Sequence, residues 1–497
     1  MTMTHWRVAG HADVPSATCR AKPWVAGPLL RKIGFGAVLA LASLEGVAQT
    51  AADADGDAVS ARPAIMFNRW QEDWSVLADP RVPRRPLDSF KYIPLSPDDA
   101  DAYLSLGANL RERFESNDAA LFGTGRNESQ GYVISRAEVH ADLHVGPRLQ
   151  MFLQLQSDFA PGKARPGPAD RNRLDLEQAF VVLTEPVGGG RLKVRLGRQQ
   201  FAFDMQRFVS VRDGPNVRQS YDAIWANYEK GAWRFITFYS QPVQTKDERV
   251  FDDGSSGNRT LSGFRVERQL TEKTSLAAYY ARFTQADAHY LTVDGDERRN
   301  VLDTHFTGAA GSVDWDIEGM AQTGRVGGKH VKAWGFGSLA GYTFADAAWA
   351  PRVGIQFDAA SGNRHPDGHT LGTFNPLFPN GAYLALAGYT GYTNFIQVKS
   401  SLTVRPSGSL KIMFGIAPQW RQTTRDAVYA QPAIPVADTA GRPGRYTGTY
   451  EQLRIDWAWS RAVSFALEAV HFDASDVIRR AGGHDSNYIG LQVSLGW

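Results

Sequence analysis

The closing stretch of the chain, YIGLQVSLGW over residues 488–497, decides the fold class because its side chains alternate without exception. Apolar residues occupy every odd position from Ile489 to Trp497, and Tyr, Gly, Gln, Ser and Gly occupy the even positions. Alternation with a period of two is typical of a β-strand with one apolar and one polar face. The same pattern recurs in 103–115 and 131–145.

Eighteen segments that we interpret as strands follow one another from Tyr103 onward, separated by Gly, Pro, Asn and Asp clusters. Long segments with the helical period of 3.6 are absent from this part of the sequence. We expect strands at 103–115, 131–145, 148–158, 174–184, 191–199, 220–229, 232–240, 261–269, 274–284, 300–308, 312–323, 331–344, 350–360, 393–405, 408–422, 448–459, 461–473 and 486–497.

The connections between these segments alternate between short turns, such as Gly146-Pro147, and mostly long loops, such as 200–219, 285–299 and 361–392. A soluble sandwich has no reason to place its tight turns at one end and its long loops at the other. Bacterial outer-membrane barrels do so, with short periplasmic turns and long extracellular loops. We therefore predict an all-β, antiparallel, up-and-down transmembrane barrel of about eighteen strands over residues 103–497.

The polar face of the predicted barrel carries charged side chains, such as Arg113, Glu138 and Asp158. An unpaired charge is costly in a dry protein interior, so we expect this face to line a wet lumen. The apolar face would then meet lipid. In 220–240 and 274–284 the pattern does not assign the two faces.

The chain before the barrel divides into a leader and an arm. The apolar run at 33–44 is shorter than the about 20 residues of a membrane-spanning helix, and we interpret residues 1–48 as a leader with a signal peptide. Residues 49–102 are polar and proline-rich, which predicts an extended periplasmic arm outside the main fold. Trp70 and Trp74 are expected to anchor this arm to the barrel rim.

The composition excludes some classes of protein. The chain has 497 residues, with 54 Lys and Arg against 52 Asp and Glu, too balanced for a typical nucleic-acid binder. Without the leader these counts are 49 and 50, and the only cysteine, Cys19, lies in the leader. His140 and His144 would lie about 13 Å apart on one strand, too far for one metal ion. The acidic turn at Asp252-Asp253 is expected to be solvated, and we expect no catalytic residue, metal or cofactor.

Six short motifs lie along the exported part: Asn68–Trp74, Lys91–Leu95, Leu110–Glu115, Glu177–Phe180, Leu196–Gln199 and Phe374–Pro379. Together with the closing strand, they resemble the alginate export family of bacterial outer-membrane barrels over about residues 65–497. The resemblance implies an eighteen-stranded monomeric barrel that passes an anionic polysaccharide, or smaller anionic solutes, through an arginine-rich constriction.

Arginines are the candidate solute contacts, because a guanidinium offers carboxylates a planar fork of donors and keeps its charge. Fixed charge around a pore sets its selectivity. Strand parity, or proximity to the loop 200–219, places the following arginines toward the lumen: Arg111, Arg113, Arg136, Arg195, Arg198, Arg207, Arg218, Arg265, Arg352, Arg405, Arg421 and Arg454. The alternative is that they form salt bridges that brace the wall.

The sequence thus predicts a passive outer-membrane channel for an anionic polysaccharide or small anionic solutes. Its other expected partners are outer-membrane lipid and the barrel assembly machinery, with no nucleic acid. Two alternatives remain at this stage: an outer-membrane barrel enzyme and an exported carbohydrate-binding β-protein.

Overall fold

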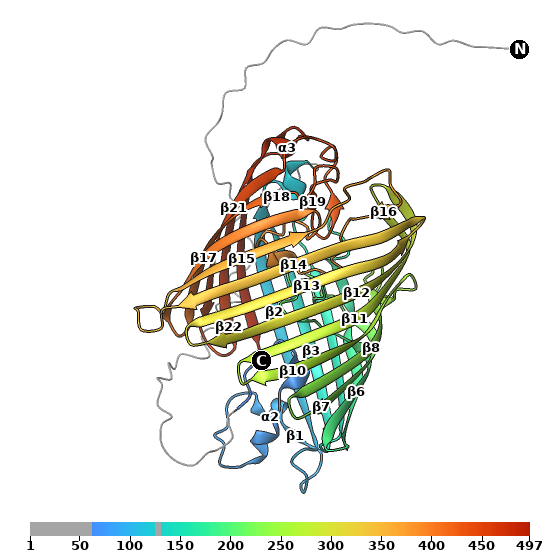
Figure 1. Ribbon diagram of the computed structural model, residues 1–497. Coiled ribbons are helices and arrows are strands. Elements are labelled where there is room, and N and C mark those ends of the chain that lie inside the picture. The colour runs from blue at the N-terminus through green and yellow to red at the C-terminus, as the bar shows by residue number, and fades with distance from the viewer. Residues whose placement is uncertain (1–61, 125–130) are drawn as a thin grey trace, which may run out of the picture. The chain divides into compact units, whose positions relative to one another are not determined.

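The computed structural model describes residues 62–124 and 131–497, so the predicted leader and the start of the arm lie outside the described residues. Eighteen long antiparallel strands form one closed barrel, in which β2 pairs with both β3 and the last strand, β23 (Figure 1). The barrel strands are β2 (Tyr103–Asn117), β3 (Tyr132–Val145), β4 (Leu149–Phe159), β5 (Asn172–Val187), β6 (Gly190–Gln199), β7 (Tyr221–Lys230), β8 (Trp233–Gln244), β10 (Arg259–Thr271), β11 (Thr274–Tyr290), β12 (Val293–Ala310), β13 (Val313–Val326), β14 (Lys329–Thr343), β15 (Arg352–Ala360), β17 (Phe395–Ser407), β18 (Leu410–Trp420), β21 (Tyr446–Ala458), β22 (Val463–Ala474) and β23 (Ser486–Gly496).

The remaining elements are short. They are η2 (Arg69–Gln71), η3 (Ser75–Ala78), α2 (Asp88–Lys91), β1 (Ile93–Pro94), η4 (Ala120–Gly123), β9 (Gly254–Ser255), β16 (Thr370–Leu371), η5 (Gly381–Tyr383), β19 (Tyr429–Ala430), β20 (Ile434–Pro435) and α3 (Asp476–Arg479). Within the described residues, no helix is long and apolar enough to cross a membrane.

The predicted fold class is confirmed, and each predicted strand segment overlaps one barrel strand. Two of the predicted long connections are wrong. Only two residues separate β11 from β12 and β13 from β14, where the sequence predicted loops at 285–299 and 324–330. The longer strands are stabilised by packing inside the barrel, since β16 pairs in parallel with β14 and Leu371 is fully buried.

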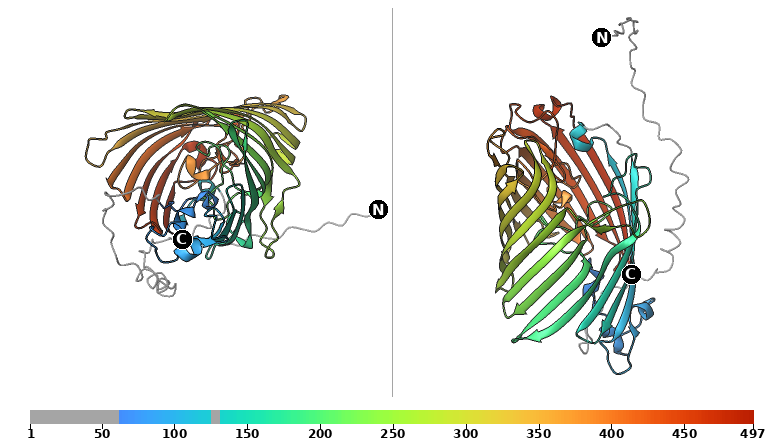
Figure 2. Two further views of the ribbon diagram at one scale, coloured as in Figure 1. Left: turned by 90° about the horizontal axis from the view of Figure 1, so that it is seen from below. Right: turned by 90° about the vertical axis from the view of Figure 1, so that its right-hand side faces the viewer.

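The outer face of the barrel is apolar, as the alternation predicts. Ile489 and Leu491 of the closing strand are exposed on the protein surface, whereas Tyr488 between β22 and β2 is buried. Val139 in β3 and Ile224 in β7 are each 53% exposed. The strands tilt around the enclosed space in both views of Figure 2.

The inner face is not polar throughout, which corrects the prediction of an entirely wet lumen. Trp225, Phe238, Tyr279 and Phe283 point inward from β7, β8 and β11 and are buried. These strands include the two segments whose faces the sequence did not assign. Their alternation is weak because both faces are apolar: one meets lipid and the other meets a loop inside the barrel.

Two long connections fold into the barrel, and we call them loop A (200–220) and loop B (361–394). Phe208 of loop A packs edge-on against Phe374 and Tyr392 of loop B, with ring centroids 5.4 and 5.0 Å apart. The backbones also pair, since the Ser210 amide donates to the Phe378 carbonyl at 3.0 Å. The two loops therefore form an internal layer that keeps the inward aromatic side chains dry.

The described part of the arm lies partly inside the barrel, which differs from the prediction of an arm outside the main fold. Trp70 packs edge-on against Phe180 of β5 at 5.7 Å, and the buried Arg69 donates to the carbonyl of Trp497 at 2.8 Å. Trp74 lies in a separate apolar cluster that joins arm residues such as Tyr92 to Tyr103 of β2. The described part of the arm and the barrel belong to one compact unit.

Candidate functional site

Nine of the twelve predicted arginines form ion pairs with carboxylates of the wall or loop A. They are Arg111, Arg113, Arg136, Arg198, Arg207, Arg218, Arg265, Arg352 and Arg454. This is the bracing arrangement that the sequence analysis weighed as the alternative. Whether any of them also contacts a solute remains a prediction.

Arg136 of β3 holds one end of loop A against the wall. Its guanidinium donates to Asp213 Oδ1 at 2.7 Å and to the carbonyls of Asn216 and Pro215 at 2.7 and 2.8 Å. Arg111 of the neighbouring strand donates to the carbonyl of Asp213 at 2.7 Å. These contacts direct most donors of the two guanidinium groups to loop A, so Arg111 and Arg136 position the loop.

Asp213 is the centre of this anchor. Its place among protein groups inside the barrel alone would raise its pKa, but its side chain is 46% exposed, and Arg218, Arg136 and Arg111 together hold the pKa of Asp213 well below its ordinary value. The carboxylate therefore stays ionised at neutral and mildly acidic pH.

The first half of loop A is anchored to the opposite part of the wall. Arg207 pairs with Asp316 and Glu318 of β13 at 2.6 and 2.8 Å, and Asp204 pairs with Arg265 of β10 at 2.6 Å. Loop A therefore crosses the interior from β2 and β3 to β12 and β13. Loop A therefore narrows the lumen of the barrel.

Three of the predicted arginines have no carboxylate within ion-pair distance among the residues that the structure describes. Arg421 is fully buried and donates to backbone carbonyls, including that of Thr439 at 2.6 Å. Arg405 is exposed near the short turn that follows β17. Arg195 of β6 points into the barrel and borders a hollow.

Aromatic rings surround the Arg195 guanidinium. It lies 4.7 Å from the ring centroid of Trp70, 5.4 Å from that of Phe180 and 5.6 Å from that of Trp225. Its Nε donates to the side-chain oxygen of Gln199. Stacking stabilises the cation without neutralising it, so its outer nitrogens keep donor capacity for an anion.

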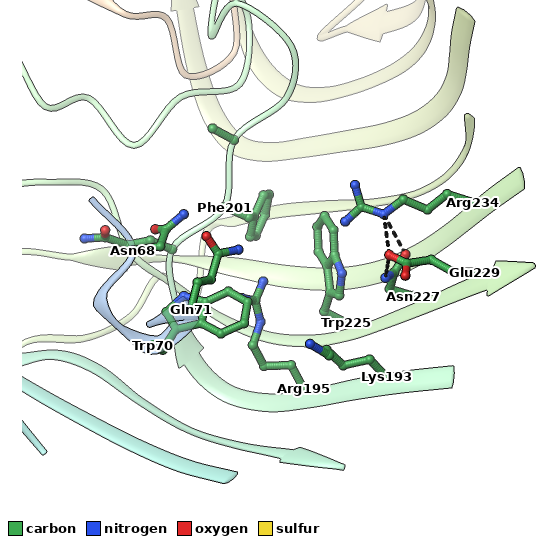
Figure 3. Close-up of a pocket in the computed structure, with 12 residues that line it drawn as sticks. Asn68, Trp70, Gln71, Lys193, Arg195, Phe201, Trp225, Asn227, Glu229 and Arg234 are labelled. Atoms are coloured by element: carbon green, nitrogen blue, oxygen red, sulfur yellow. Dashed lines mark hydrogen bonds and ion pairs between the residues drawn. The ribbon is translucent and has the colours of Figure 1, made fainter. Parts of the chain in front are cut away.

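The hollow beside Arg195 has a volume of ≈ 240 Å³ and is lined by the arm, loop A and strands β6 to β8 (Figure 3). Lys193 borders it and has no carboxylate within ion-pair distance in the described chain, whereas Arg234 shares its charge with Glu229 at 3.6 Å. The other lining residues supply amides and aromatic faces: Asn68, Gln71, Gln200, Asn227, Trp70, Phe201 and Trp225. Basic, amide and aromatic groups together suit an organic anion with apolar faces.

Of the residues that line this hollow, only Arg195 was predicted from the sequence to contact solute. Lys193 has the same strand parity as Arg195, so the alternation rule was sufficient to find it. Trp225 and Arg234 lie in the segment whose faces the sequence did not assign. Trp70 was expected at the rim, and no sequence signal indicated that the arm enters the barrel.

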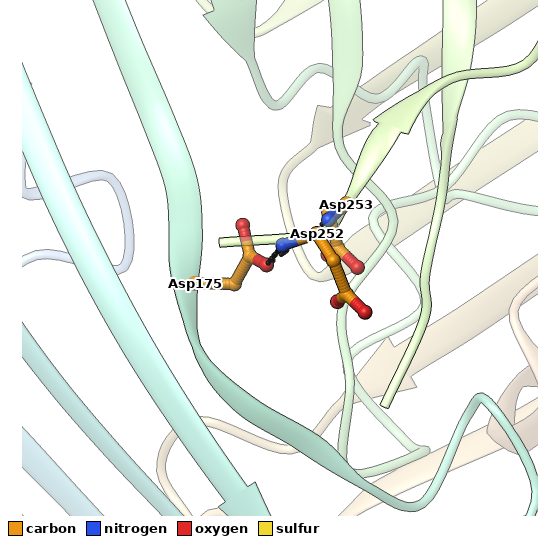
Figure 4. Close-up of side chains that lie close together, drawn as sticks. All are labelled: Asp175, Asp252 and Asp253. Atoms are coloured by element: carbon orange, nitrogen blue, oxygen red, sulfur yellow. Dashed lines mark hydrogen bonds between the residues drawn. The ribbon is translucent and has the colours of Figure 1, made fainter. Parts of the chain in front are cut away.

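Asp175, Asp252 and Asp253 form an acidic cluster between β5 and the loop before β10 (Figure 4). Asp175 accepts hydrogen bonds from the backbone amides of Asp252 and Asp253 at 2.8 and 3.1 Å. The pKa of Asp253, in the loop, is raised to about 6, first by burial and then by the neighbouring Asp175. The cluster fastens the loop to the wall, where the sequence predicted a solvated turn.

The closed barrel, its apolar outer face and its partly polar interior define a transmembrane β-barrel channel of the bacterial outer membrane. Within that class, the chain belongs to the alginate export family, whose model matches residues 102–492. Among curated proteins, no sequence matches the chain.

Solved outer-membrane porins share the fold at low sequence identity. OccD3 of Pseudomonas aeruginosa is 10% identical with a TM-score of 0.55, and the match covers 82% of this chain and 93% of that one. OccAB1 of Acinetobacter baumannii is 11% identical with a TM-score of 0.55, covering 82% and 99%. OccK2 of P. aeruginosa, solved in complex with glucuronate, is 9% identical with a TM-score of 0.52, covering 80% and 97%.

Proposed function

We propose that this protein is a passive channel for anionic solutes that carry sugar-acid units, either as small molecules or as an anionic polysaccharide. The observation that carries the proposal is the Arg195 guanidinium, which stacks on Trp70 and Trp225 beside a hollow and has no carboxylate partner among the described residues. A solute carboxylate would supply the missing counter-charge.

The chemistry of the hollow favours a sugar acid over a simple inorganic anion. The apolar faces of a sugar ring pack well on Trp and Phe side chains, and its hydroxyl groups find partners in Gln71 and Asn227. The glucuronate complex of OccK2 is a precedent for a sugar acid in a barrel of this fold.

The size of the hollow favours contact with one sugar ring at a time. Its ≈ 240 Å³ is below the about 300–1,000 Å³ typical of sites for drug-sized ligands. Loop A and the arm border it on two sides, so a polysaccharide would pass as a single extended strand.

Reversal potentials across planar bilayers test the charge preference. In a gradient of potassium glucuronate, we expect the wild-type channel to favour the anion, and the Lys193→Gln/Arg195→Gln variant to lose that preference. The conservative Arg195→Lys variant keeps the charge and is expected to retain it. A wild-type channel that favours potassium contradicts the proposal.

A control of unchanged net charge tests whether disturbing a pair of lumenal ionic side chains is enough to shift the reversal potential. Arg352 and Asp314 form an ion pair at the Nη2 and Oδ1 atoms, and the Arg352→Gln/Asp314→Asn variant leaves the net charge unchanged. We expect its reversal potential to equal that of the wild type. A shift as large as that of the Lys193→Gln/Arg195→Gln variant would show that the hollow has no special role.

A further inference from the structure

A second group of carboxylates lies inside the barrel, where loop A meets the wall. Asp204 of loop A, Asp303 of β12 and Glu318 of β13 each offer a carboxylate oxygen, and these oxygens lie within 4.8 Å of one another. Two distant parts of the sequence therefore bring three like charges together, which needs a compensating positive charge.

The unusual member of this group is Asp303. Its side chain is 0% exposed, and neither of its carboxylate oxygens has a hydrogen-bond partner among the described residues. Tyr279 lies directly opposite in the register of β11 and β12, and its hydroxyl is also buried without a partner. The charged form of a buried carboxylate without a donor is strongly disfavoured unless a ligand compensates it.

The neighbouring cations are already engaged by the other carboxylates. Arg265 and His305 contact Asp204 at 2.6 and 2.7 Å. Arg207 contacts Glu318 at 2.8 Å, and it also pairs with Asp316, as His305 does. None of these groups reaches Asp303 within ion-pair distance in the described chain.

We propose that Asp204, Asp303 and Glu318 bind a hard divalent cation of the Ca²⁺ type. An all-oxygen ligand set suits such an ion, and water would complete its coordination. Asp204 also lines a hollow of ≈ 280 Å³, which offers space for that water. Because the ligands come from loop A and from two wall strands, the ion would hold the loop across the channel.

The acidic cluster of Figure 4 supplies an internal control. In that cluster, Asp175 accepts two backbone amides, and Asp253 accepts the Lys246 amide and the Asn172 side chain at 2.7 Å each. Asp252 accepts the Arg249 amide at one oxygen only, at 2.9 Å, but each carboxylate of this cluster has at least one donor, whereas Asp303 has none among the described residues. We expect no tight cation binding there.

Terbium luminescence tests the proposal on the full chain refolded in detergent at pH 7. Tb³⁺ replaces Ca²⁺ at oxygen sites, and the ring of Tyr279 is placed to sensitise its emission. We expect one saturable site that Ca²⁺ displaces, a Tb³⁺ affinity reduced at least tenfold in Asp303→Asn, and an unchanged affinity in Asp253→Asn. Heat-modifiable migration on gels verifies that each variant is folded.

The wild-type protein alone gives an independent measurement should Asp303→Asn fail to fold. Ca²⁺ should raise its melting temperature relative to EDTA and slow the proteolysis of loop A. The absence of a saturable Tb³⁺ site, or an unchanged affinity in folded Asp303→Asn, would overturn the proposal and indicate that a proton alone neutralises Asp303. Neither result bears on the anion preference measured at Arg195.

Discussion

Two parts of the barrel wall hold loop A by different chemistry: one uses charged groups alone, and the other adds aromatic rings to ion pairs such as Asp204 with Arg265 of β10. Strands β2 and β3 grip residues 213–216 with guanidinium groups that donate to backbone carbonyls and to Asp213. Strands β7 to β11 hold the start of the same loop with aromatic rings: Phe203 lies 5.8 Å from Trp225 and 5.2 Å from Tyr279. The side chains on the inner face of a transmembrane barrel are therefore polar or apolar according to the segment that packs against them, whereas those on the outer face are apolar because they contact lipid.

The largest effect is expected from breaking the charged anchor. Replacing Arg136 by Ala removes the ion-pair partner of the buried Asp158 and one of the three arginines that pair with Asp213, and removing one member of a buried pair costs about 3–5 kcal/mol. We expect urea unfolding to show this loss and proteases to cut loop A in the folded barrel. Protection equal to that of the wild type would show that the contacts at the start of loop A, which are the aromatic rings and the ion pairs of Asp204 and Arg207, are sufficient to hold it.

Breaking the aromatic anchor should cost somewhat less. Phe203 is 5% exposed, and Phe→Ala substitutions in a core cost about 3–5 kcal/mol. We expect the lower end of this range for Phe203→Ala, since the cavity opens toward a hollow that water can enter. Phe203→Leu retains most of the apolar volume and serves as the control, with a loss of about 1 kcal/mol.

The outer faces of the two wall regions should respond alike. Val139 and Ile224 belong to different regions but are both 53% exposed toward lipid. An arginine on the lipid face costs about 2–4 kcal/mol at the bilayer midplane. We expect Val139→Arg and Ile224→Arg to destabilise the refolded barrel by similar amounts; a loss confined to one of them would place the other outside the hydrocarbon layer.

The smallest effect concerns pH. Because the pKa of Asp213 is depressed in the folded protein, its contribution to stability is present above the pKa of the unfolded chain and is lost only as pH falls through the lower folded value. Protease protection of loop A should therefore be equal at pH 7 and pH 5. Release of residues 213–216 at pH 5 would contradict this anchor.

The alternation of apolar and polar residues was sufficient to predict the strand number, the outer face and the closing strand from Ile489 to Trp497. It was not sufficient where both faces are apolar, as in β7 and β11, because the period of two then disappears. It also placed loops at 285–299 and 324–330, where strands continue because loop B packs against their inner side.

The candidate site was less predictable for a related reason. Parity indicates that an arginine points inward but not what meets it there. Strand parity places both Arg136 and Arg195 toward the lumen. Arg136 donates hydrogen bonds to loop A, whereas Arg195 stacks on aromatic rings beside a hollow.

What the sequence by itself determined is the barrel. Outward residues contact lipid and are therefore apolar, so the sequence shows a local period of two. Only the tertiary structure decided which lumenal charges are paired, which strands have an apolar inner face and that the described part of the arm lies partly inside the barrel. Those outcomes depend on contacts between residues far apart in the sequence, such as Arg136 with Asp213 and Trp70 with Arg195, and no local pattern records them.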